Sequence, residues 1–217
     1  MKNIIITGSN GMMGRLILET CLNRDDINKI TSITRRSIGI THPKLIEVLH
    51  NDFLDFSKIE DQFKNQHTCF FCIGVYTGQV PKEEFKKITV SFTQAFAEAL
   101  KRNSPDSTFC FLSGQGADSS EKSSIPFARE KGIAENILLK LKFKHTYLFR
   151  PGYIYPSTPR KEPNPGYKIM RFLYKPLSRL FPRIGVTSVH LANKMVEVGL
   201  NGGDKIIYEH RDILLPV

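Results

Sequence analysis

The chain has 217 residues, of which 41% are apolar and 24% are charged, and it carries a formal net charge of +10. This length suits a single domain spanning residues 1–217, and the 15 Phe and 7 Tyr give it enough surface to bury, which argues against disorder. No apolar run approaches the ~20 residues of a bilayer-spanning helix, so we expect no membrane span.

Apolar runs alternate along the chain with amphipathic helical patterns. Strands are expected at Asn3–Thr7, Lys29–Thr34, Leu45–Leu49, Thr68–Ile73, Thr108–Leu112, Thr146–Phe149 and Lys205–Tyr208. Helices are expected at Gly11–Asn23, Ser57–Lys64, Lys82–Lys101, Phe127–Lys140 and Ser188–Leu200. Continuous apolar strands separated by helices are typical of a parallel sheet covered on both faces. We therefore predict a six- or seven-stranded doubly wound α/β fold, Rossmann-like, with a small C-terminal insertion lobe.

The four cysteines include one CxxC pair, Cys69 and Cys72. Both lie in an expected strand, where side chains three positions apart point to opposite faces and cannot bind one metal ion. We expect buried core thiols here, and the six histidines show no metal-binding spacing either. The sequence therefore predicts no metal site.

A glycine-rich loop joins the first expected strand to the first expected helix. It reads Thr7-Gly8-Ser9-Asn10-Gly11-Met12-Met13-Gly14. The first glycine permits a tight turn, the second lets a pyrophosphate approach the backbone, and the third lets the helix pack closely on the strand. The helix N-terminus then offers unpaired N–H groups to phosphates, and a purely structural turn would not explain three glycines at this junction. The pattern predicts a dinucleotide site comprising Thr7, Gly8, Asn10, Gly11, Met12, Met13 and Gly14.

The residues after the second strand favour NADP over NAD. An NAD site usually has an Asp or Glu there, whereas this chain has Arg35 and Arg36, which suit a 2′-phosphate. The alternative is a solvated basic turn that binds nothing. Further on, Asp52 and Phe53 follow the third strand, where a polar side chain can meet the adenine edge. Gly74, after the fourth strand, lets the backbone approach the ribose.

Several of these motifs together resemble the atypical short-chain dehydrogenases/reductases, and most closely their small NAD(P)H-binding oxidoreductase-like group. They are the TGxxGxxG pattern, the strand-end arginines, Ser113 before a glycine, the Gly116-Ala117-Asp118 and Lys131-Gly132 segments, and Arg150-Pro151-Gly152. The resemblance covers most of the chain. It implies a Rossmann-like fold and nicotinamide chemistry, with Pro151 at the coenzyme.

Enzymes of the resembling family use a Ser, a Tyr and a Lys for catalysis. The resemblance carries over Ser113 and Lys131, but the position of the Tyr is occupied by Phe127, one helical turn before Lys131. General acid–base catalysis contributes about 10²–10⁴-fold, so the missing hydroxyl matters. Lys131 can still hold a ribose, whereas Phe127 can only fill space. Tyr153 and Tyr76 are candidate replacement proton donors, although each is more often a cleft wall.

A basic stretch, Arg160–Arg183, has seven Lys or Arg and one acidic residue, with aromatic residues between them. It falls in the segment 151–186, expected to be a substrate-side or cap insertion. The charges can bind nucleic acid, a lipid interface or an anionic substrate. An amphipathic cap with a solvated basic face is favoured, because charge runs usually face solvent.

Two functions remain open from the sequence. One is an NADP-dependent oxidoreductase acting on a small carbonyl, quinone or enone substrate. The other is a non-catalytic NADP-binding module that senses redox state or binds a partner through its basic lobe. The first residues are too short an apolar stretch for a secretory signal, so we expect a cytoplasmic protein. We expect a monomer or homodimer with a small-molecule substrate, and nucleic acid is the less favoured partner.

Overall fold

The computed structural model describes residues 1–76, 78–158, 171–174 and 184–216. Within these ranges one seven-stranded sheet has the strand order β3-β2-β1-β4-β5-β6-β9, and every neighbouring pair is parallel. Its strands are β1 (Lys2–Thr7), β2 (Ile27–Thr34), β3 (Leu45–Leu49), β4 (Thr68–Phe71), β5 (Thr108–Leu112), β6 (His145–Arg150) and β9 (Ile207–Glu209). The predicted doubly wound, Rossmann-like α/β fold is confirmed.

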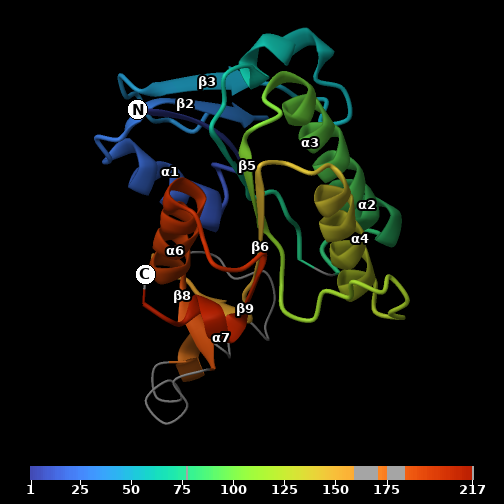
Figure 1. Cartoon of the computed structure of the whole chain (residues 1–217). Coiled ribbons are helices and arrows are strands. Elements are labelled where there is room, and N and C mark those ends of the chain that lie inside the picture. The colour runs from blue at the N-terminus through green and yellow to red at the C-terminus, as the bar shows by residue number, and fades with distance from the viewer. Residues whose placement is uncertain (77, 159–170, 175–183, 217) are drawn as a thin grey trace.

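Helices cover both faces of the sheet (Figure 1). One face carries α1 (Met12–Leu22) and α6 (Ser188–Asn201), which pack side by side. The other carries the 3-10 helix η1 (Ser57–Phe63), the helical segments α2 (Lys82–Lys86), η2 (Lys87–Ser91) and α3 (Phe92–Asn103), and α4 (Pro126–Lys140). Two apolar clusters result, one on each face of the sheet. Burial on both faces explains why the strands are apolar throughout rather than alternating.

The two residues of the CxxC pair point to opposite faces of the sheet. Cys69 belongs to the cluster under α3 and α4, and Cys72 packs against the cluster under α1 and α6. Cys69 is fully buried, as the strand pattern predicts. Cys72 is only partly buried, because β4 ends at Phe71 rather than at the predicted Ile73, so Cys72 is not the closed core thiol that was expected.

Several element boundaries differ from the sequence predictions. The predicted helix Lys82–Lys101 is a continuous helical run from α2 to α3 that contains the π-helical segment η2 and continues to Asn103. β2 begins two residues earlier than predicted, and β6 gains one residue at each end. The starts of β2 and β6 lack Gly or Pro signals, so backbone pairing with the neighbouring strand decides where each of the two strands begins.

The C-terminal part adds elements that the sequence pattern did not show. β7 (Tyr153–Tyr155) and β8 (Gly185–Thr187) pair in parallel as a separate two-stranded sheet, and α7 (His210–Ile213) follows β9. These strands have only three residues each, too few for a readable period. Most of the expected insertion 151–186 and of the basic stretch Arg160–Arg183 lies outside the described residues. None of the helices in the described ranges is long and apolar enough to span a bilayer.

Candidate functional site

A cavity of about 710 Å³ opens at the carboxyl ends of the central strands. It lies where the loops after β1 and β4 diverge, which is the point at which the strand order of the sheet reverses. Ligands of open α/β sheets bind at such switch points. The lining residues are Gly11, Met12, Met13, Cys72, Ile73, Gly74, Val75, Tyr76, Leu112, Ser113, Gly114, Phe127, Lys131, Pro151, Gly152 and Ile154.

Two glycines of the loop after β1 are required by close backbone contacts. Gly8 has a φ of +80°, and a Cβ there would lie 2.6 Å from the carbonyl of Cys72. A Cβ on Gly14 would lie 2.2 Å from the carbonyl oxygen of Gly8. Any side chain at either position therefore displaces the loop, and α1 packs directly against the turn that follows β1.

The N-terminus of α1 faces this cavity without a side-chain cap. Gly11 is the N-cap residue, it makes no side-chain capping bond, and the first turn contains no acidic residue. Gly11, Met12 and Met13 line the cavity. The first N–H groups of a helix have no partner within the helix and carry partial positive charge, so this end suits a phosphate.

The loop after β2 places the two predicted arginines in solvent. Arg35 and Arg36 are both exposed. Asn10 joins this loop to the glycine loop, because its amide donates to Thr34 Oγ1 at 2.8 Å and to the carbonyl of Arg36 at 2.7 Å. Neither arginine nor Asn10 lines the cavity itself.

The acidic residue nearest to this loop comes from β3. Glu47 accepts hydrogen bonds from the Ser37 hydroxyl at 2.8 Å and from the Ile38 backbone N–H at 2.5 Å. The Arg15 guanidinium already has partners within the protein, since it pairs with Glu19 at 2.7 Å and donates to the Ile38 carbonyl. Arg35 and Arg36 are therefore the basic side chains of this edge that the described contacts leave exposed.

Some predicted coenzyme residues have structural roles in this arrangement. Thr7 is fully buried and its hydroxyl donates to the Ile33 carbonyl in β2 at 2.9 Å. Phe53 is buried in the aromatic cluster, 5.6 Å from the Phe56 ring, so its side chain does not reach the cavity. Asp52 is exposed and caps its own turn through the Leu54 N–H. Gly74 and Pro151 both line the cavity.

A buried polar network lies beneath the cavity at the ends of β5 and β6. The Ser113 hydroxyl donates to Glu135 of α4, and Arg150 of β6 forms a two-point ion pair with the same carboxylate. Arg150 also bonds Glu209 at 2.9 Å and the Ser119 hydroxyl at 2.9 Å. Glu135 is 1% exposed, so its charge is compensated wholly by these partners.

Sequence reasoning missed Glu135, although a signal for it was present. Glu135 follows Lys131 by four residues on α4, and Phe127 precedes Lys131 by four. The three side chains therefore lie along one face of the helix. Arg150, the ion-pair partner of Glu135, was noted in the sequence only as part of the Arg150-Pro151-Gly152 motif. Nothing in the sequence shows that the two residues meet, because they belong to different elements.

Lys131, on α4, contributes its side chain to the lining of the cavity. Its Nζ donates to the Leu112 carbonyl at 2.9 Å and lies 4.6 Å from the centroid of the Phe111 ring. Burial lowers the pKa of this ammonium to about 8, partly offset by the nearby charge of Glu135. The neighbouring Gly132 lets α4 approach closely, since a Cβ there would lie 1.8 Å from the Asp118 carbonyl oxygen.

The three aromatic residues considered for the cleft are placed differently. Phe127 lines the cavity, and its ring lies over Gly114, where a Cβ would be 2.5 Å from the ring. Tyr76 also lines the cavity. Tyr153 does not, because on β7 its ring packs 5.7 Å from that of Tyr174. The structure thus brings Ser113 and Lys131 together with Phe127 but separates them from Tyr153.

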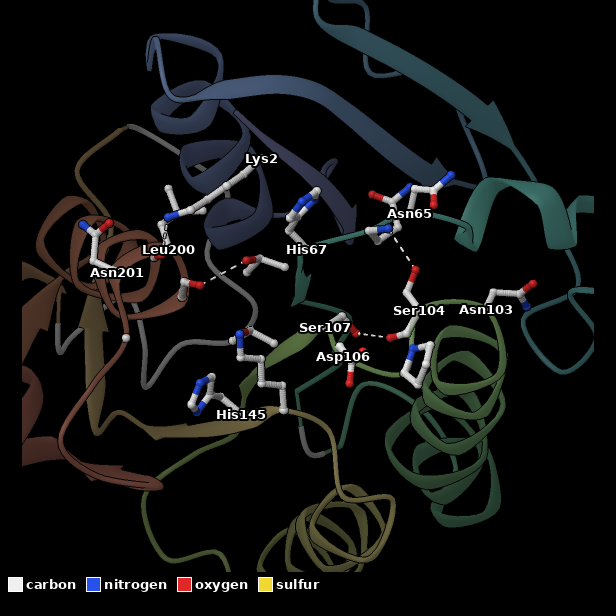
Figure 2. Close-up of a pocket in the computed structure, with 17 residues that line it drawn as sticks. Lys2, Asn65, His67, Asn103, Ser104, Asp106, Ser107, His145, Leu200 and Asn201 are labelled. Atoms are coloured by element: carbon white, nitrogen blue, oxygen red, sulfur yellow. Dashed lines mark hydrogen bonds between the residues drawn. The ribbon is translucent and has the colours of Figure 1, made fainter.

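A second cavity, of about 530 Å³, opens at the amino ends of the strands (Figure 2). Its polar lining serves the ends of helices. Ser104, at the carboxyl end of α3, donates to the Phe63 carbonyl and accepts from the Gln66 N–H. Thr68 and Lys2 donate to the carbonyls of Gly199 and Leu200 at the end of α6. These bonds satisfy terminal helix carbonyls, and this cavity lies at the opposite edge from the glycine loop.

Comparison with known proteins identifies relatives along most of the chain. Protein HTATIP2 of Rattus norvegicus is 28% identical over 173 residues, which are 78% of this chain and 69% of that protein. Protein FMP52-1, mitochondrial, of Scheffersomyces stipitis is 24% identical over 218 residues, 96% of this chain and 95% of that protein. The expected cytoplasmic location is contradicted by these fungal relatives, which are named mitochondrial. The sequence argument considered only a secretory signal, and other targeting signals do not depend on one.

Solved structures show the same fold. The Bordetella bronchiseptica enzyme WbmH, solved in complex with NAD+, superposes with a TM-score of 0.70 at 17% identity and covers 96% of this chain and 75% of that one. A short chain dehydrogenase family protein from Francisella tularensis gives a TM-score of 0.67 at 14% identity, with 98% of each chain covered.

The resemblance to atypical short-chain dehydrogenases/reductases is confirmed at the level of family. The NAD dependent epimerase/dehydratase family matches residues 4–158, which contain every strand that bounds the cavity. The glycine loop, the switch-point cavity and Lys131 all fall within this match. The chain belongs to the NAD dependent epimerase/dehydratase family.

Proposed function

We propose that this protein binds NADP(H) at the opening of α1 and is an oxidoreductase acting on a small carbonyl, quinone or enone substrate. One observation carries the proposal: the uncapped N-terminus of α1 lines a cavity at the switch point of the sheet. The residues present fit a dinucleotide, because Gly8 and Gly14 let the loop after β1 pack tightly against the chain after β4 and against α1, and no acidic side chain lies in the first turn of α1.

Arg35 and Arg36 support NADP as the coenzyme. Both are exposed beside the glycine loop, and Asn10 ties their backbone to it. The only acidic group that the described contacts place at this loop, Glu47, is bonded to Ser37 and Ile38. A guanidinium pair without a free carboxylate suits a 2′-phosphate. We propose that the family's nicotinamide site is here adapted to NADP, with NAD the weaker ligand.

The cavity also has room for a small substrate. A bound nicotinamide coenzyme supplies or accepts a hydride. Lys131, Ser113 and Tyr76 provide polar side chains of the wall, whereas other lining residues are apolar, among them Met12, Ile73, Phe127 and Ile154. An apolar cleft with few polar groups excludes water and holds an uncharged carbonyl, quinone or enone. We propose that residues 151–186 form the substrate side, since Pro151, Gly152 and Ile154 already line the cavity.

Phe127 favours a second candidate function. Because the residue over Gly114 has no hydroxyl, the protein can instead be a non-catalytic NADP-binding sensor. NADPH oxidation with a panel of small carbonyls, quinones and enones separates the two. The oxidoreductase proposal expects turnover that is lost when Gly14→Ala blocks the coenzyme site. Tight NADPH binding without turnover, together with activity installed by Phe127→Tyr, would favour the sensor.

A further inference from the structure

At the wall of the cleft formed by β5 and α4, neither Phe127 nor Ser113 offers a hydroxyl proton to a substrate. Tyr76, on the chain after β4, carries the other hydroxyl among the described lining residues. Phe127 has no exchangeable proton. Ser113 has one, but its hydroxyl donates to Glu135. Because the Glu135 carboxylate is paired at two points with Arg150, it accepts rather than donates, and the Ser113 proton points away from the cavity. Toward the cavity, Ser113 therefore offers only lone pairs.

Lys131 is placed to fill this gap. An ammonium has three N–H donors, and the described contacts give one of them to the Leu112 carbonyl at 2.9 Å. The remaining two make no hydrogen bond to a described residue, although the Nζ also lies over the Phe111 ring. The side chain is 7% exposed and lines the cavity one helical turn from Phe127. A ligand in the cavity is therefore the natural acceptor for its free N–H groups.

The titratable and charged groups around Lys131 come from α4, the chain after β4, β6 and β9. Glu135 lies on α4, Cys72 follows β4, and Arg150 on β6 connects Glu135 to Glu209 on β9. From β5, Phe111 presents its ring face. Burial destabilises the ammonium and Glu135 stabilises it, so the pKa falls to about 8 rather than further. An acid with a pKa close to the working pH transfers its proton most effectively.

We propose that Lys131 is the proton donor of this cleft, with Glu135 as the positioning residue that holds it charged. This inference rests on the proposed oxidoreductase function. When a substrate carbonyl carbon accepts a hydride from a reduced nicotinamide coenzyme, which is thereby oxidised, the C=O π pair moves to oxygen. That oxygen takes a proton from Lys131 Nζ and becomes a hydroxyl. Lys131 is left as a neutral amine and regains its proton from water.

The first test follows Lys131 in the free protein. NMR of the Lys131 Cε resonance in isotopically labelled protein measures its titration directly, without coenzyme or turnover. We expect a midpoint near the pKa of about 8, and Glu135→Gln should lower that midpoint by about 1 unit. A merely structural role for Glu135 would leave the midpoint unchanged. A Lys131 midpoint near 10.5, its ordinary value, would overturn the proposal.

The second test separates charge from proton donation. Lys131→Arg keeps a cation and a donor for Leu112, but a guanidinium does not release its proton. We expect NADPH affinity, measured by calorimetry, to stay within about tenfold and kcat to fall at least ~100-fold. Lys140→Arg, an exposed change on the same helix, should leave both unchanged. If Lys131→Arg does not fold, Lys131→Met takes its place, with the same expectation for kcat.

The pH profile completes the test. In the wild type, kcat/KM for carbonyl reduction should fall as the pH rises above about 8, and the fall should begin at lower pH in Glu135→Gln. Turnover by Lys131→Arg at a third or more of the wild-type rate would overturn the proton-donor role alone. A wild type that binds NADPH but reduces none of the panel would overturn the proposed function and this inference with it.

Discussion

The two ends of the parallel sheet carry cavities of comparable size but different chemistry. At the amino ends, the Ser104 hydroxyl donates to the last carbonyl of η1. The Thr68 hydroxyl and Lys2 donate to carbonyls at the end of α6 (Figure 2). At the carboxyl ends, an uncapped helix N-terminus, a buried lysine and a buried ion pair surround the cavity. The first arrangement satisfies the fold's own polar groups, whereas the second leaves donors without a partner among the described residues. Unused donors, rather than cavity size, distinguish a binding site here.

The largest difference between the two ends of the sheet should appear in the unfolding free energy that a substitution at each end removes. Glu135→Ala leaves Arg150 partly unpaired in a buried site, and losing one member of a buried ion pair costs about 3–5 kcal/mol of unfolding free energy. At the amino end, Ser104→Ala removes two neutral hydrogen bonds and should cost only about 1–2 kcal/mol. Urea denaturation measures both. Equal losses at the two ends would contradict the contrast drawn between them.

Lys131 should give stability an unusual pH dependence. Its pKa is about 8 in the folded protein and 10.5 for an unperturbed lysine, so between these values the unfolded chain binds more protons. Stability conferred by this group must therefore rise as the pH increases from 8 to 10.5, by about 3 kcal/mol at full extent. The measurement is the unfolding free energy of the wild type minus that of Lys131→Met across this range. A flat or falling difference would show that the ammonium is not destabilised by burial.

Coenzyme preference should depend on the exposed arginines. We expect NADPH to bind at least tenfold tighter than NADH, about 1.4 kcal/mol, and Arg35→Ala with Arg36→Ala to remove this preference without weakening NADH. The backbone bond from Asn10 to Arg36 survives the change, so the loop should keep its shape. Arg15→Ala is the matched control, because Arg15 is already paired with Glu19. If the double variant keeps its preference, these arginines do not contact the coenzyme.

The smallest effect is expected at the amino-end cavity. Lys144 is exposed and lines that cavity, yet Lys144→Ala should change NADPH affinity by less than about 0.5 kcal/mol. Calorimetry on this variant checks whether the second cavity has any part in coenzyme binding. A loss of NADPH affinity comparable to that of the arginine variants would place the nucleotide at the amino ends of the strands and contradict the proposed site.

The sequence predicted the sheet and the glycine loop because both depend on local patterns. Apolar runs buried on two faces and glycines three residues apart are readable without a structure. The Glu135–Arg150 pair was not predictable, since its members lie on α4 and β6 and meet only after the sheet forms. The hydroxyl proton of Ser113 points to Glu135 and away from the cavity. This orientation depends on the same ion pair, so the sequence could not predict it either. The burial of the Phe53 side chain was not predicted either, because a residue after a strand can turn into the core as easily as toward a ligand.

The most direct test of the central claim is calorimetric titration of NADPH into the wild type and into Gly14→Ala. A Cβ at Gly14 would lie 2.2 Å from the Gly8 carbonyl oxygen and must displace the opening of α1, whereas the exposed Lys144 lines the cavity at the opposite edge of the sheet. We predict tight binding by the wild type and by the control Lys144→Ala, and at least ~100-fold weaker binding by Gly14→Ala. No heat of binding in the wild type, or equal affinity in Gly14→Ala, would contradict a dinucleotide site at the start of α1.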